Sequence, residues 1–123
     1  MNILCIGDIV GRPGREAVAF ALPRIKKEHN IDFVIANAEN ASGGAGLIPK
    51  NADEILSYGV DVMTMGDHTW DKPDIFPYLQ EHQDKIRHAP NQRGVDLGGK
   101  GEPPVTREFG RGPHQADDKR QEK

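Results

Sequence analysis

The chain contains 123 residues, which is enough for one domain and too few for two. Its formal net charge of −3 at pH 7 argues against the strongly basic face on which many nucleic-acid binders depend, and its one cysteine excludes an internal disulfide. Hydrophobic residues make up 36% of the chain, below the usual range for a globular domain, so we expect part of it to lie outside the core. Neither a leader-like segment nor a long apolar span is present, a pattern typical of a soluble cytoplasmic protein that enters no membrane.

The first predicted element is a buried strand over residues 2–6, because this stretch is short and nearly all apolar. Cys5 lies in its middle and is expected to be a small buried apolar residue. Residues 7–14 form a glycine-rich turn that lacks both the Gly-Lys-Ser/Thr ending of a P-loop and the glycine spacing of the dinucleotide fingerprint, which argues against a Rossmann-type dehydrogenase. Glycines serve plain tight turns as well as loops that approach an anion or a metal-bound ligand, and both interpretations stay open.

A helix is predicted from Arg15 to about residue 29, because apolar residues recur there at three- and four-residue spacing and form one face. These residues are Val18, Ala21, Leu22 and Ile25. Pro23 lies inside the pattern and is expected to kink the helix or to split it. A second strand follows over residues 33–36, and then a glycine-containing loop over residues 37–46.

The next predicted helix begins at Pro49, near the position that proline favours, and ends at Gly59, where glycine suits the C-cap. A third strand over residues 60–65 is apolar and rich in β-branched residues. A third helix is predicted to start at residues 72–74 and to be interrupted by Pro77.

The α/β domain is predicted to cover residues 1–92, with a short fourth strand beginning at Ile86. Residues 93–123 differ in composition, because glycine, proline and mixed charges dominate and apolar residues are few. Such a segment cannot bury enough apolar surface to offset the entropy lost on ordering. We therefore predict a largely disordered tail over residues 93–123.

Three strand-like runs each end in a carboxylate, and two of these carboxylates have an amide or an imidazole beside them. The side chains concerned are Asp8, Glu39, Asn40, Asp67 and His68. If the runs are parallel neighbours, these side chains converge on one edge of the sheet, where open α/β sheets bind their ligands. For a single acid the alternative is a helix N-cap, and the spacing alone also leaves open a nucleotide- or metal-binding module.

The chemistry of this acidic edge suits metal ions. Hard cations prefer oxygen ligands, and histidine brings iron, manganese or zinc. Glu39 could bridge two metals, with Asp8 on one and Asp67 on the other, and paired metals can clamp a phosphoryl group. His68 would lie beside the phosphate as a hydrogen-bond donor or proton source, and Asn40 would hold a phosphate oxygen or a metal.

Three motifs occur in order along the chain: IGDIVGRPGR at residues 6–15, NAENA at residues 37–41 and MGDHTWDK at residues 65–72. Together they resemble the YmdB-type metallophosphoesterases, bacterial enzymes of the calcineurin-like superfamily, and the resemblance runs from Met1 to about Ala89. It implies the N-terminal half of a four-layer α/β/β/α sandwich with two divalent or trivalent metal ions, most often iron or manganese. It also implies hydrolysis of phosphodiester bonds, with cyclic nucleotides as substrates.

The resemblance assigns a role to each of the five side chains. Asp8 is implied to be a metal ligand, Glu39 the ligand that bridges both metals, and Asn40 a further metal position beside them. Asp67 occupies a metal-ligand position, and His68 is implied to be the catalytic acid. At Asp67 the chain departs from the family motif Gly-Asn-His-Thr, because a carboxylate replaces the amide. The added negative charge should strengthen cation binding and weaken the attraction of a phosphate.

Length is the second departure from the family. Family members are longer, and the resemblance implies that their second half supplies a further sheet and several histidine ligands, which nothing after Gln92 matches. We expect a truncated or frameshifted gene product with an exposed apolar sheet face, weak metal occupancy and little or no catalysis. The alternative function is an inactive homologue that binds metal or nucleotide, or that associates through the exposed sheet as a homo-oligomer.

Overall fold

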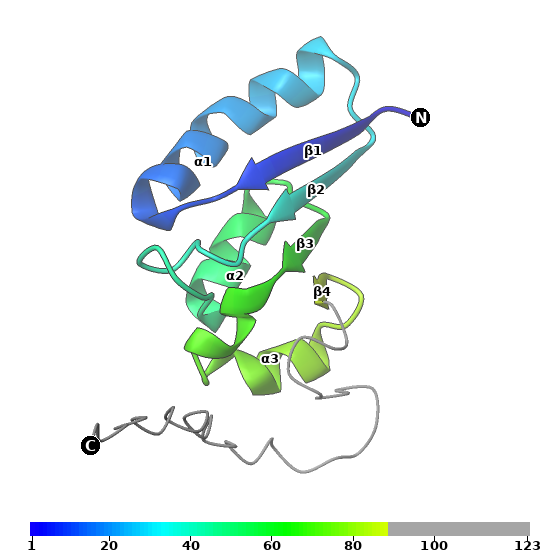
Figure 1. The fold of residues 1–123 in the computed structure, drawn as a ribbon. Coiled ribbons are helices and arrows are strands. Elements are labelled where there is room, and N and C mark those ends of the chain that lie inside the picture. Colours follow the sequence, from blue (N-terminus) through cyan, green and yellow to red (C-terminus); the bar gives the residue numbers. More distant parts are fainter. Residues whose placement is uncertain (89–123) are drawn as a thin grey trace, which may run out of the picture.

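Eight elements follow one another in the computed structural model, which describes residues 1–88 (Figure 1). They are β1 (Ile3–Asp8), α1 (Gly11–Glu28), β2 (Phe33–Asn37), α2 (Pro49–Ser57), β3 (Val62–Met65), the 3₁₀ helix η1 (Asp67–Asp71), α3 (Ile75–Glu81) and β4 (Ile86–His88). The predicted disordered tail over residues 93–123 lies outside the described residues.

The four strands form one sheet in the order β1-β2-β3-β4, and every neighbouring pair is parallel. Helical segments connect each strand to the next, as parallel pairing requires. The carboxyl ends of the strands therefore meet at one edge of the sheet (Figure 1). The predicted α/β class is confirmed, and the three acid-bearing strands meet the condition set for a shared edge, because they are parallel neighbours.

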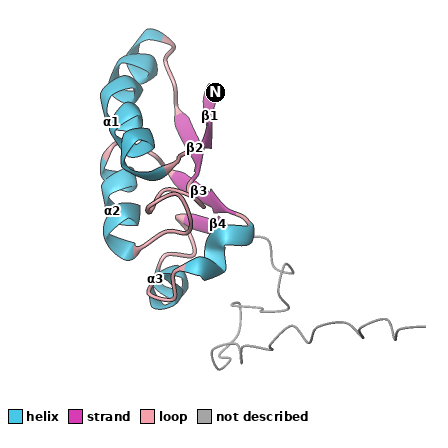
Figure 2. Cartoon of the chain, turned by 60° about the vertical axis from the view of Figure 1, so that its left-hand side comes forward, coloured by secondary structure: helices cyan, strands magenta, loops and turns pink. Residues whose placement is uncertain are grey.

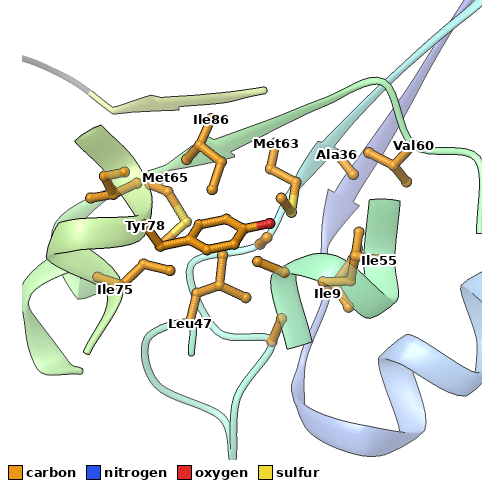
Figure 3. Close-up of a cluster of buried hydrophobic side chains, with 14 of the residues drawn as sticks. Ile9, Ala36, Leu47, Ile55, Val60, Met63, Met65, Ile75, Tyr78 and Ile86 are labelled. Carbon is orange, nitrogen blue, oxygen red and sulfur yellow. The ribbon is translucent and has the colours of Figure 1, made fainter. Parts of the chain in front are cut away.

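One face of the sheet packs against α1 and α2, which lie on the same side of it (Figure 2). Alternate residues of β2, β3 and β4 are buried in this layer. They are Val34, Ala36, Met63, Met65 and Ile86. Figure 3 shows Leu47, Ile55, Ile75 and Tyr78 in one cluster with Ala36, Met63, Met65 and Ile86. Burying one such aliphatic side chain stabilises the fold by about 1.5–3 kcal/mol, so this layer holds the helices on the sheet.

The opposite face of β1 has no described element over it. Ile3 is 48% exposed and Cys5 is exposed, whereas Leu4 and Ile6 are half-buried against the core. The predictions of a buried first strand and of a buried Cys5 are therefore wrong, because β1 is an edge strand that the elements of residues 1–88 cover on one face only. A short apolar run does not reveal whether one face or both faces of a strand will be covered.

α1 begins at Gly11 rather than at Arg15 and takes in the end of the predicted glycine-rich turn. Pro13 lies in the first helical turn, where a missing N–H removes no helical hydrogen bond. Pro23 lies inside the helix, yet α1 runs unbroken for 18 residues, so the predicted split does not occur. The neighbouring Leu22 is 1% exposed, and its packing on the sheet offsets the bond that proline cannot make.

The remaining elements are close to their predicted positions. α2 ends at Ser57 and β3 begins at Val62, so both are slightly shorter than predicted. Pro77 lies in the first turn of α3 and does not interrupt it. The predicted fourth strand is present as β4. Among residues 1–88, no helix is long and apolar enough to cross a membrane.

Candidate functional site

A β-bulge at the end of β1 sets the position of Asp8. Gly7 separates Ile6 from Asp8, but the residues that pair with them on β2 are adjacent, and Asp8 pairs with Asn37. Asn40, in the turn after β2, donates from Nδ2 to both carboxylate oxygens of Asp8, each at 3.0 Å. The first two predicted site residues are therefore joined directly.

Glu39 links the end of β2 to the end of β3. Its carboxylate accepts hydrogen bonds from Asn37 Nδ2 and from the backbone N–H of His68, each at 3.3 Å. Gly66 leaves room for this contact, because a Cβ at that position would lie 2.5 Å from Glu39 Oε2 and 2.7 Å from Oε1. The glycine at the end of β3 thus lets the carboxylate lie directly against the backbone.

His68 is paired with an acid of its own turn. Its Nδ1 lies 2.6 Å from Oδ2 of Asp71, and the side chains are 47% and 38% exposed. The hydrogen bond to Asp71 raises the pKa of His68 above its usual value, and the negative charges of Asp71, Glu39 and Asp67 act in the same direction. The imidazole therefore carries a proton more readily than a free histidine does.

Asp67 is exposed, and its carboxylate makes no hydrogen bond or ion pair with other residues of the described segment. It lies next to His68 in η1 and acts on it through charge alone. Of the five predicted side chains, the structure joins Asp8 to Asn40 and Glu39 to His68, and it leaves Asp67 beside them. Their roles in metal binding and catalysis stay predictions.

The fit of these residues to a metal ion is partial. Carboxylate and amide oxygens are suitable donors, and Asn40 Oδ1 is buried without a hydrogen-bond partner among the described residues. Within residues 1–88, however, no three His, Cys, Asp or Glu side chains lie close enough together to hold a metal ion. The donors are right in kind but too few, so a metal would need further ligands.

The loop that carries Glu39 is tied to its surroundings. The buried hydroxyl of Ser42 accepts hydrogen bonds from the backbone N–H of Ile48 at 3.0 Å and from Asn51 Nδ2 at 2.7 Å. The N–H of Gly46 donates to the carbonyl of Glu39 at 2.6 Å. The Ser42 bonds fasten the loop to the start of α2, and the Gly46 bond closes the loop on itself.

Gly46 also brings this loop against η1. Its φ of +80° is one that residues with a side chain rarely adopt. A Cβ there would lie 2.6 Å from Lys72 Cγ and 3.3 Å from the carbonyl oxygen of His68. The turn with Glu39 and the turn with His68 are therefore in close contact at a position that only glycine fits.

Trp70, a residue of η1, packs this turn against neighbouring elements. Its ring centroid lies 5.4 Å from that of Phe76 in α3 and 5.9 Å from that of His88 in β4, both within the range of favourable aromatic pairs. The turn that carries His68 is thus packed on α3 and β4.

Sequence reasoning missed three participants: Asn37, Gly66 and Asp71. Asp71 has a readable signal, because it follows His68 by three residues and such pairs meet on one face of a helical turn. The contacts of Asn37 and Gly66 with Glu39 depend on how the two turns meet, which spacing along the chain does not show.

Sequence comparison finds relatives of known family. The family model described as YmdB-like protein matches residues 4–108. The 2',3'-cyclic-nucleotide 2'-phosphodiesterase of Bacillus subtilis is 43% identical over 89 residues, which are 72% of this chain and 34% of that protein. A putative phosphatase/phosphodiesterase of Mycoplasma genitalium is 36% identical over 87 residues, which are 71% of this chain and 31% of that protein.

Solved structures give the same picture. A hypothetical protein from Thermus thermophilus matches with a TM-score of 0.67 and 36% identity, over 74% of this chain and 34% of that one. A phosphatase from Mycoplasma pneumoniae matches with a TM-score of 0.68 and 31% identity, over 72% of this chain and 31% of that one. The chain therefore spans about a third of the length of the relatives that it matches.

Proposed function

The chain belongs to the YmdB-like protein family, and on this premise we propose that it contributes to the hydrolysis of phosphodiester bonds, with cyclic nucleotides as the substrates. The observation that carries the proposal is the meeting of three strand ends. Asp8 with Asn40 and Glu39 with the His68 backbone form two hydrogen-bonded pairs at one edge of the sheet. The relatives are described as phosphodiesterases or phosphatases, which supports the same reaction class.

Two metal ions, iron or manganese, are part of this proposal. Asp8, Glu39, Asn40 and Asp67 would hold them, together with ligands from outside residues 1–88. When bound, such ions supply Lewis-acid stabilisation of the charge on a phosphoryl group. The carboxylates attract the cations, and the bond from Asn40 fixes the orientation of the Asp8 carboxylate.

His68 would act as the proton donor to the leaving oxygen. Asp71 occupies Nδ1, so Nε2 is the ring atom left to face a substrate. The raised pKa of His68 favours the imidazolium, which is the form that a general acid requires. The Asp71 contact also limits rotation of the ring.

The test is hydrolysis of bis(p-nitrophenyl) phosphate and of a 2',3'-cyclic nucleotide by the purified 123-residue chain with added Mn²⁺ or Fe²⁺. We expect His68→Ala to lower the rate by about 10²–10⁴, the usual contribution of a general acid. His29→Ala is the matched control, because His29 is an exposed histidine at the C-terminal end of α1. Equal rates in the wild type and His68→Ala would overturn the assignment of His68.

A second candidate function is a non-catalytic chain that binds metal or nucleotide and associates through its uncovered sheet face. The exposure of Ile3 and Cys5 on β1 favours it, because apolar side chains on an edge strand invite pairing with another chain. Sedimentation equilibrium separates the two candidates when combined with the hydrolysis assay. A monomer would argue against association, and turnover with Mn²⁺ would argue against a non-catalytic role.

A further inference from the structure

Arg15 places its positive charge between α1, α2 and the turn that follows β2. It belongs to α1, and its side chain is only 12% exposed. Nη1 donates to the carbonyl oxygen of Ala41 at 2.6 Å, and Nε donates to Oε2 of Glu54 in α2 at 3.1 Å. A cation this far from water requires such partners, and charge-assisted hydrogen bonds of this kind are among the stronger ones in proteins.

Glu54 is itself held in place behind Arg15. Its other carboxylate oxygen accepts a hydrogen bond from the hydroxyl of Tyr58, one turn further along the chain. The bond from Tyr58 lowers the pKa of Glu54, and the nearby charge of Arg15 acts in the same direction. The carboxylate is therefore ionised at neutral pH and keeps the guanidinium turned toward Ala41.

The carbonyl that Arg15 binds belongs to the turn of the candidate site. Ala41 directly follows Asn40, and its own N–H donates to the carbonyl of Ala38 at 3.1 Å. The preceding carbonyl, of Asn40, accepts from the N–H of Gly11 at 2.9 Å. Two successive carbonyls of this turn are thus bound by α1, one through backbone and one through Arg15.

The side chains of the same turn point to the other parts of the site. Asn40 reaches Asp8, and Glu39 reaches the backbone of His68. A shift of the turn by a fraction of an ångström would break these contacts, because the Glu39 bonds are already 3.3 Å long. The placement of both side chains therefore depends on what anchors their backbone.

We propose that Arg15 is a positioning residue for the candidate site: its bonds to Ala41 and Glu54 fix the turn over residues 38–41, and thereby set Asn40 against Asp8 and Glu39 against His68. Its importance for catalysis rests on the proposed function, whereas its effect on the turn does not. Arg12, on the same helix, is the natural contrast, because it pairs with Glu16 at the surface and its side chain is 80% exposed.

The experiment measures backbone amide exchange by NMR in the full chain without metal or substrate. Arg15→Ala is compared with the wild type and with Arg12→Ala. We expect exchange at Gly11 and Gly46, which donate to Asn40 and Glu39, to become about tenfold faster in Arg15→Ala, with Met63 of β3 unchanged. The Nδ2 signals of Asn40 should also move. Arg12→Ala should change none of these.

If Arg15 only contributed to the overall stability of the fold, the exchange pattern would be different. Loss of global stability accelerates exchange in β3 together with the turn, and this uniform result would overturn the proposal, as would unchanged exchange at Gly11 and Gly46. Arg15→Lys should restore part of the protection, because one ammonium cannot span both acceptors as the guanidinium does. If Arg15→Ala does not fold, Glu54→Ala should give the same local pattern, since it removes the group that orients Arg15. Exchange needs no turnover, so a failed hydrolysis assay leaves this result intact.

Discussion

The two turns that form the candidate site are held in place by different means. The β2 turn, residues 38–46, is anchored by backbone hydrogen bonds, by the Arg15 guanidinium and by the hydroxyl of Ser42, which is 5% exposed. The β3 turn, residues 66–71, is held by packing around Trp70 and by an exposed histidine–aspartate pair. The difference teaches that one half of the site is anchored from several elements of the fold, while the other half keeps its candidate site residue His68 and the partner Asp71 partly in solvent.

This contrast implies that the site residues of the β2 turn and those of the β3 turn respond differently to substitution. Glu39 and Asn40 project from backbone that is fixed on several sides, so their positions are set before any ligand arrives. His68 depends on its Asp71 contact and on the Glu39 carboxylate that accepts its backbone N–H. Substitutions in the β2 turn should therefore act on stability, and those in the β3 turn on the chemistry of single side chains.

The largest effect is expected where the two turns touch, from Gly46→Ala. The φ of +80° costs about 1–2 kcal/mol for a residue with a side chain, and the new Cβ would also press on Lys72 and on the His68 carbonyl. We expect the free energy of unfolding, measured by urea denaturation, to fall by about 2 kcal/mol or more. The matched control is Gly43→Ala, which has a φ of +66° but no atom within 4 Å of its Cβ. Equal losses in the two variants would contradict a contact between the turns.

Gly66→Ala should move the Glu39 side chain and leave the stability of the fold nearly unchanged. Its Cβ would collide with the end of the flexible Glu39 side chain, which can rotate away, so we expect the free energy of unfolding to change by less than about 1 kcal/mol. The Glu39 contact with the His68 N–H should be lost, and the His68 amide signal should shift in the NMR spectrum. Gly7→Ala is the control, because nothing lies within 4 Å of its Cβ. An unmoved His68 amide in Gly66→Ala would argue against the contact.

Asp71→Asn tests the histidine–aspartate pair of the β3 turn alone. Because the Asp71 hydrogen bond is the main cause of the raised pKa of His68, its removal should lower that pKa toward the ordinary value. In the wild type, protonated His68 favours the folded state at low pH, and this contribution is lost as pH rises through the raised pKa. NMR titration of the imidazole measures the change directly, with Asp74→Asn as the control. The same midpoint in Asp71→Asn and in the wild type would show that the pair does not form in solution.

The smallest effect on the fold is expected from Asp67→Asn, because Asp67 is exposed and its carboxylate makes no hydrogen bond within residues 1–88. The free energy of unfolding should change by less than about 0.5 kcal/mol. Removing its charge should weaken Mn²⁺ binding and raise the rate of phosphodiester hydrolysis, since less negative charge then opposes the phosphate. Calorimetric titration with Mn²⁺ and the hydrolysis assay measure the two effects. A lower rate in Asp67→Asn would contradict the charge argument.

The sequence was sufficient to predict three strands that each end in an acid, whereas their parallel pairing entered only as a condition. Once the strands are parallel neighbours, Asp8, Glu39 and Asp67 lie at the same edge, because parallel strands end on the same side of a sheet. The exposure of Cys5 was beyond reach, since it depends on which elements cover the second face of β1. The start of α1 at Gly11 was missed because proline and glycine are turn signals as well as first-turn residues of helices.

The contacts that organise the site were harder to predict than the site itself. Arg15 meets Ala41 across 26 residues of sequence and Glu54 across 39, and no local pattern encodes either pairing. The contact between Gly46 and η1 likewise arises from a loop that folds back on a turn formed much later in the chain. Such anchors become visible only when the backbone of both partners is known.

The bulge at Gly7 decides the face of the sheet on which Asp8 lies. Side chains alternate between the two faces of a strand, so in a regular strand that kept Gly7 but had no bulge Asp8 would follow Leu4 and Ile6 onto the helix-covered face and bury an unpaired charge there. The bulge reverses this order and aligns Asp8 with Asn37. A larger residue at position 7 has open space around it, and deletion of Gly7 would leave Asp8 directly after Ile6, still on the face opposite Leu4 and Ile6. In a comparison of homologous chains, this position should therefore tolerate substitution.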